Sequence, residues 1–199
     1  MSQLLPIVGP VSPTGPEATP SIITIQKVKL KDQQLTCEFT EQRTQDAPPR
    51  AFSLTCAEQV HPDLSHRLSR LVPHLCLLTE QQTETPDFWP DTAEELPARF
   101  QTFTVTGFSM GKHQVGVTLI GQRALTTGKV LNLTSPYVRF DDETDAAYAY
   151  APLLETELSE VLAEVEAALR GKCTEYRQLD LFEEPGTTNV LLVSTRPEA

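Results

Sequence analysis

Residues 100–133, FQTFTVTGFSMGKHQVGVTLIGQRALTTGKVLNL, contain the pattern that decides the fold. Large apolar residues alternate with threonine and other polar residues in three parts of this stretch, around Phe103, Val117 and Leu131. Such alternation is typical of a strand with one buried face. Residues 107–111 are expected to form a bend, and Thr127-Gly128 is a tight-turn signal. We therefore predict three antiparallel strands here.

The N-terminal part of the chain shows a similar strand pattern. Residues 21–30 are rich in isoleucine and other β-formers, and residues 35–39 alternate between apolar and polar side chains after a turn at Lys31-Asp32-Gln33. Residues 41–50 are polar, contain a Pro-Pro pair and indicate a loop. Phe52, Leu54 and Cys56 then predict a third strand. We expect these strands to continue the sheet of residues 100–133.

Two amphipathic helices are predicted. The first begins at His61-Pro62-Asp63, because proline is tolerated at the first helical position and aspartate favours the positive end of the dipole. Pro73 falls inside its apolar stripe and is expected to kink or divide it. The second begins at Pro152 and ends near Gly171, a natural C-cap. The apolar stripe of the first helix consists of Leu64, Leu68, Leu71, Val72, Leu75 and Leu78. The stripe of the second consists of Leu154, Leu158, Val161, Leu162, Val165 and Leu169.

These elements predict an α+β fold in which a mostly antiparallel sheet of about six strands packs with two amphipathic helices, in the order β-β-β-α-β-β-β-α. Residues 21–173 are expected to form the single α+β domain. Residues 1–20 contain five prolines and predict a disordered, extended N-terminal tail. Residues 174–199 are expected to form a second flexible tail. Phe88 and Trp89, in the acidic loop of residues 79–97, are expected to fold back onto the core.

Composition limits the classes of function. The chain of 199 residues has a formal net charge of −11, which argues against a general duplex-DNA binder but allows a local basic face or a charge mimic of nucleic acid. Its four cysteines show no C-x-x-C spacing, so we expect reduced thiols and a cytoplasmic protein. Neither a signal peptide nor a run of transmembrane length is recognised, so no membrane contact is expected.

No nucleotide-binding, hydrolase or zinc motif is present, and we predict a non-enzymatic protein without a cofactor. An acidic loop contains Asp141, Asp142, Glu143 and Asp145, whose oxygens are of the type that Mg²⁺ or Ca²⁺ prefers. A solvated charge run is the favoured interpretation, because the loop lacks EF-hand spacing. A metal-dependent nuclease that uses this loop is the weakest of the hypotheses kept.

A basic stripe is the candidate nucleic-acid contact. Lys27 and Lys29 alternate on one strand face and Lys31 follows at the turn, so the three charges could run along the backbone of single-stranded DNA. Arg123 and Lys129 flank the Thr127-Gly128 turn and would extend the stripe if the strands join. The alternative, which we favour, is an exposed strand that lysine protects from aggregation.

The stretch Gln178-Leu179-Asp180-Leu181-Phe182 resembles the sliding-clamp-binding motif of bacterial replication and repair proteins, whose preferred form is Gln-Leu-Ser/Asp-Leu-Phe. The resemblance implies that Gln178 hydrogen-bonds at the rim of the clamp pocket, Leu179 contacts its edge and Asp180 permits a turn. Leu181 and Phe182 would fill the apolar pocket. The alternative is a strand of the domain, because Leu179 and Leu181 also fit a period of two.

The body is similar to small uncharacterised phage and prophage proteins over most of residues 21–182. The resemblance is carried by His61-Pro62-Asp63-Leu64, Val72-Pro73-His74-Leu75, Val105-Thr106-Gly107-Phe108-Ser109 and Gly128-Lys129-Val130-Leu131-Asn132-Leu133, together with the motif-bearing end. It favours an accessory protein of phage-type DNA replication or recombination. In this leading hypothesis the five-residue motif docks on the sliding clamp, and the body makes protein contacts or weak contacts with single-stranded DNA. The second hypothesis is an acidic inhibitor or DNA mimic, based on the glutamates of residues 155–166 and the Asp141 loop. The sequence leaves homo-oligomerisation open.

Overall fold

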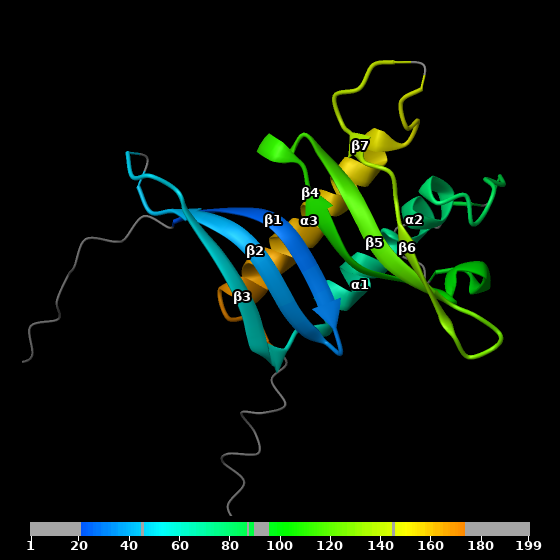
Figure 1. The fold of residues 1–199 in the computed structure, drawn as a ribbon, viewed down its shortest axis with the longest axis horizontal. Coiled ribbons are helices and arrows are strands. Elements are labelled where there is room, and N and C mark those ends of the chain that lie inside the picture. The colour runs from blue at the N-terminus through cyan, green and yellow to red at the C-terminus, as the bar shows by residue number, and fades with distance from the viewer. Residues whose placement is uncertain (1–20, 45, 87, 90–95, 145, 174–199) are drawn as a thin grey trace, which may run out of the picture.

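Seven strands form one antiparallel sheet in the computed structural model, which describes residues 21–44, 46–86, 88–89, 96–144 and 146–173 (Figure 1). The strand order is β3-β2-β1-β4-β5-β6, and β7 pairs with β5 beside this path. The predicted α+β class and element order are confirmed. The strands are β1 Ile22–Lys31, β2 Gln34–Gln42, β3 Arg50–Gln59, β4 Phe103–Met110, β5 Gly116–Ala124, β6 Val130–Thr134 and β7 Val138–Arg139.

The sheet consists of two halves that are joined by a short seam. Strands β1 to β3 form one meander and β4 to β7 form the other, and β1 pairs with β4 through only three residue pairs. Val28 and Phe108 face each other in the middle of this seam, and both are fully buried. At Gly107 a β-carbon would lie 2.1 Å from the Val28 carbonyl oxygen. The seam therefore closes only because residue 107 has no side chain.

The helices all lie on one side of the sheet (Figure 1). They are α1 Pro62–Arg70, α2 Val72–Leu78 and α3 Ala151–Leu169, and the single-turn 3-10 helices are Ala98–Phe100 and Lys112–Gln114. Pro73 lies in the first turn of α2, so the predicted division of the first helix is confirmed. Leu154, Leu158, Val161 and Val165 of α3 are buried, as their spacing predicted. None of the helices among the described residues is long and apolar enough to cross a bilayer.

The structure contradicts one expectation from the sequence and confirms another. The predicted bend at residues 107–111 is wrong, because β4 continues through Gly107 to Met110 and the chain turns at the 3-10 helix Lys112–Gln114. Instead, the register of β4 relative to β5 shifts between Val105 and Gly107. The expectation that Phe88 and Trp89 fold back onto the core is confirmed, since Phe88 is fully buried and its ring meets the Phe100 ring edge-on at 5.2 Å.

The seam gives a direct stability prediction. We expect Gly107→Ala to lower the free energy of unfolding by roughly 2–3 kcal/mol, because the added methyl group would clash with backbone atoms of β1 that cannot move without breaking the pairing. Chemical denaturation measures this change. Ser109→Ala, two residues along the same strand, serves as the matched control and should change stability by less than about 0.5 kcal/mol. Equal effects of the two substitutions would contradict the proposed role of the seam.

Candidate functional site

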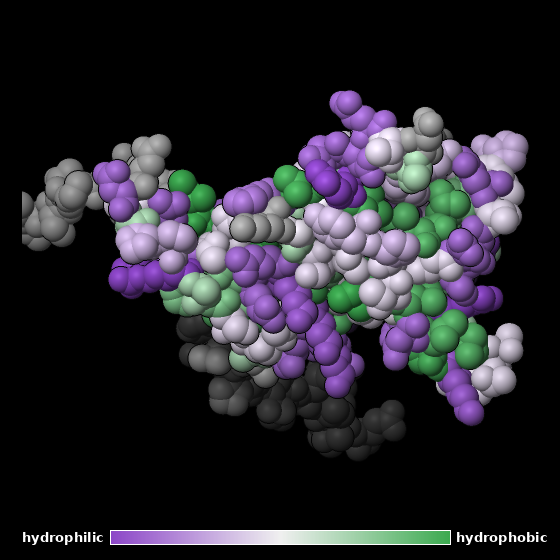
Figure 2. Space-filling model, turned by 45° about the horizontal axis from the view of Figure 1, so that its top comes forward, coloured by the Kyte–Doolittle hydropathy of each residue, from purple (hydrophilic) through white to green (hydrophobic). Residues whose placement is uncertain are grey.

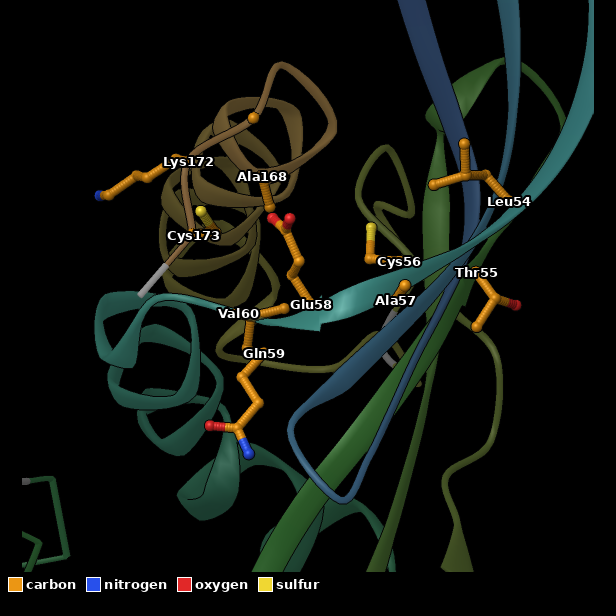
Figure 3. Close-up of a pocket in the computed structure, with 11 residues that line it drawn as sticks. Leu54, Thr55, Cys56, Ala57, Glu58, Gln59, Val60, Ala168, Lys172 and Cys173 are labelled. Carbon is orange, nitrogen blue, oxygen red and sulfur yellow. The ribbon is translucent and has the colours of Figure 1, made fainter. Parts of the chain in front are cut away.

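A hollow of about 320 Å³ lies between β3 and the C-terminal end of α3 (Figure 3). Leu54, Cys56 and Glu58 of β3 point to the side on which Ala168 of α3 lies, whereas Gln59 points away. The lining is mostly apolar, and the hollow is partly open to solvent. A hollow of this kind offers a contact for an extended peptide, because one wall is the edge of a sheet.

The C-terminal end of α3 is held beside β3 and α1. Lys172 Nζ lies 2.7 Å from the Asp63 carboxylate and 2.7 Å from the Glu164 carboxylate, so the ammonium group joins the start of α1 to α3. Cys173 then forms an isolated antiparallel bridge with Val60, directly after β3. The chain therefore leaves the described domain at the outer side of β3.

A buried aromatic cluster surrounds His74. Its Nδ1 lies 2.9 Å from the Tyr148 hydroxyl, and its ring packs against Trp89 at a centroid distance of 4.8 Å. The Tyr150 ring also packs against Trp89, at a centroid distance of 4.6 Å, and its hydroxyl donates a hydrogen bond to Glu84. The cluster attaches the loop of residues 79–89 to the segment that precedes α3. Burial lowers the pKa of His74 to about 3, so the ring is neutral at physiological pH.

The titratable groups of the described body favour packing roles. Burial raises the pKa of the Cys37 and Cys76 thiols to about 12, so both are protonated and weak nucleophiles. His74 is buried, with 1% of the residue exposed. Within the described ranges, no three His, Cys, Asp or Glu side chains are grouped so that they could hold a metal ion.

Two carboxylates of the acidic loop accept hydrogen bonds from residues two positions away in the sequence. Arg139 donates two hydrogen bonds to Asp141, at 3.0 and 2.9 Å, and this pairing lowers the pKa of Asp141. The Thr144 amide donates to Asp142 and lowers the pKa of that carboxyl group as well. Asp145 lies outside the described residues. The geometry fits the favoured interpretation of a solvated turn.

The glutamates of α3 are largely paired with basic residues of the same chain. Glu157 meets Arg70 at 3.2 Å with both side chains nearly buried, and Glu160 pairs with Arg67 of α1. Glu164 pairs with Lys172 and Glu166 with Arg170. Much of the negative charge that suggested a DNA mimic therefore holds α1 and the end of α3 together. This arrangement leaves fewer uncompensated charges for a partner.

The basic stripe is divided between the two faces of the sheet. Lys27 and Lys29 lie on the face opposite the helices, and Lys27 pairs with Glu38 at 3.5 Å. Arg123 of β5 instead lies opposite Phe103 of β4, on the helix-covered face. Its guanidinium group lies 5.1 Å from the centre of the Phe103 ring. Lys31 lies at the end of β1 and Lys129 in the exposed turn before β6. The structure does not bring Arg123 into a stripe with the lysines of β1.

The open face of the sheet is polar (Figure 2). Hydrophilic residues run across the middle of the face in view. The described strands place lysine, threonine, serine and glutamine on this side and no aromatic side chain. The exposed Tyr137, which precedes β7, lies against Gly116 of β5 on this face. The face therefore offers one tyrosine rather than a row of aromatic residues for stacking on bases.

The clamp-like motif, Gln178 to Phe182, lies outside the described residues, as does the N-terminal tail. The sequence reasoning missed the hollow beside β3, because alternation in residues 52–56 indicates a strand but not its place at the edge of the sheet. Comparison of the chain with protein-family models, with curated proteins and with solved structures found no match.

The environment of His74 predicts a pH dependence. The folded pKa of about 3 lies below the ordinary value of 6.5, so between these values the unfolded chain binds a proton that the folded chain does not. Stability should therefore fall as the pH is lowered through this window, by up to about 1.4 kcal/mol per pH unit from this residue. Denaturation at pH 4.5–7 should show a shallower pH dependence for His74→Gln, which retains a partner for Tyr148.

Identical slopes for His74→Gln and the wild type would show that His74 is not the group that titrates.

Proposed function

We propose that this protein is a non-enzymatic accessory protein of phage-type DNA replication or recombination, recruited to the bacterial sliding clamp through Gln178-Leu179-Asp180-Leu181-Phe182. The observation that carries the proposal is the match of all five positions to the clamp-binding motif. A few apolar anchors in one short segment suit recognition by a preformed pocket.

The position of the motif supports this role. Every buried hydrophobic residue of the described chain lies between Ile25 and Val165, and the described part ends at Cys173. Gln178 follows Cys173 by five positions, which span up to about 17 Å when extended. A clamp could therefore bind the motif without displacing a helix of the body.

In this proposal the folded body, residues 21–173, contacts single-stranded DNA. Its polar open face provides Lys27 and Lys29 for single-stranded DNA, which is the second part of the proposal. The alternative of an acidic inhibitor depends on free carboxylates. The pairing of Glu157, Glu160 and Glu164 with basic residues makes α3 a poor source of them.

Calorimetric titration of the full chain into a bacterial sliding clamp tests the proposal. We expect a dissociation constant on the order of micromolar, because ordering the peptide offsets part of the binding energy. Leu181→Ala/Phe182→Ala should weaken binding by about two orders of magnitude or more, since two buried anchors are lost. Its fold, followed by circular dichroism, should be unchanged.

The matched control is Leu191→Ala/Leu192→Ala, which removes two apolar residues of the same segment outside the motif and should bind as the wild type does. Absence of binding by the wild type would refute clamp recruitment. Unfolding of the motif variant would instead assign the five residues to the sheet of the domain.

A further inference from the structure

The outer edge of β3, residues 50–58 on the side away from β2, ends the sheet. β3 is the last strand in the order, and no other strand of the described chain pairs along these residues. Phe52 and Leu54 are 40% and 42% exposed although they share a face with the buried core residue Cys37 and with Phe39. A long edge with exposed apolar side chains is a template for one more strand.

The structure contains the beginning of such a strand. Val60 and Cys173 form an antiparallel bridge at the end of β3. Lys172, held by Asp63 and Glu164, fixes the chain just before this bridge. The direction of the bridge means that a strand continuing from Cys173 would run along the outer edge of β3 toward Arg50.

Pairing that continues from this bridge places the leucines of the motif on the same face as the exposed apolar side chains of β3. β3 has two more residues than β2 between Thr55 and Gln59, where the pairing of these two strands shifts. An added strand that matches these extra residues places Leu179 opposite Leu54, and one that passes over them places Leu179 opposite Phe52. In both registers Leu179 and Leu181 lie on the same face as the even-numbered residues of β3. Directly opposed side chains point to the same face. The even-numbered residues of β3 point toward the side of α3, as Figure 3 shows for Leu54 and Cys56. Both leucines of the motif would therefore face the exposed apolar side chains of β3 and the side of the hollow.

The register in which Leu179 lies opposite Leu54 brings one like-charge pair together. Glu175 would lie opposite Glu58, and Arg177 would lie diagonally across from Glu58. The diagonal neighbour is within reach of a long side chain, so Arg177 offsets the repulsion between the two carboxylates. The hollow of about 320 Å³ leaves room beside Glu58 and Ala168 for these side chains.

We propose that residues 174–182 of this chain bind the outer edge of β3 as an additional antiparallel strand, which covers Leu179 and Leu181 of the motif. The motif is then held by its own domain and is released when a partner takes it. The consequence for the clamp rests on the proposed function above. Self-docking reduces the apparent affinity for the clamp in proportion to the fraction of molecules in which the motif is free.

Hydrogen exchange of the full-length protein tests the docking itself without a clamp. We expect Leu179→Ser/Leu181→Ser to raise the exchange rate of residues 50–58 several-fold and to leave α2 and α3 unchanged. Leu191→Ser/Leu192→Ser is the matched control and should exchange as the wild type does. Alkylation of Cys56, which lines the hollow, should also become faster in the motif variant.

Two results would overturn this proposal. Equal exchange of residues 50–58 in the wild type and the motif variant would show that the segment does not cover β3. Protection that increases with protein concentration would assign the edge to a second copy of the chain. Protection that is independent of concentration and lost in the motif variant supports docking within one chain.

Clamp titration tests the regulatory consequence. Leu54→Glu, which places a charge on the docking edge, should bind the clamp several-fold more tightly than the wild type. Leu131→Glu is the control, because Leu131 is equally exposed at 42% on β6, at the opposite edge of the sheet. Equal affinity of the two variants would refute self-inhibition. If no variant binds the clamp, the proposed function fails, and hydrogen exchange still decides whether the segment docks.

Discussion

The short seam between β1 and β4 is the constraint on which the rest of the structure depends. Three residue pairs join two meanders into one sheet, and the absence of a side chain at Gly107 lets the strands approach. The fully buried side chains of Val28 and Phe108 lie at the seam, on the helix-covered face. On this face α1 and α2 contact β4 and β5, and the Arg70–Glu157 pair joins α1 to α3.

The same arrangement determines where the molecule can meet a partner. α1 and α2 pack on β4 and β5, whereas β3 lies at the far end of the other meander, with both faces largely exposed. The C-terminal end of α3 returns the chain to this strand through the bridge between Val60 and Cys173. The edge of β3 and the segment that follows Cys173 are therefore neighbours as a result of topology, and our two proposals concern the same part of the molecule.

Much of the fold was predictable because local patterns report local structure. The apolar stripe of α3 and the division of the first helix at Pro73 followed from helical spacing and from proline chemistry. The exposure of Leu54 was not predictable, because alternation does not reveal which strand lies at an edge. The separation of Arg123 from Lys27 was also hidden, since irregular pairing in β1 and β4 decides which face each residue takes. The clamp motif stays a prediction from sequence alone.

Taken together, the two proposals have residues 174–182 exchange between β3 and a sliding clamp. Hydrogen exchange of residues 50–58 in the full-length wild type, measured with and without a saturating amount of clamp, tests this claim most directly. We predict that the clamp increases exchange in these residues several-fold, because it removes the strand that protects them. Unchanged exchange in a complex whose formation is verified by calorimetry would contradict the claim.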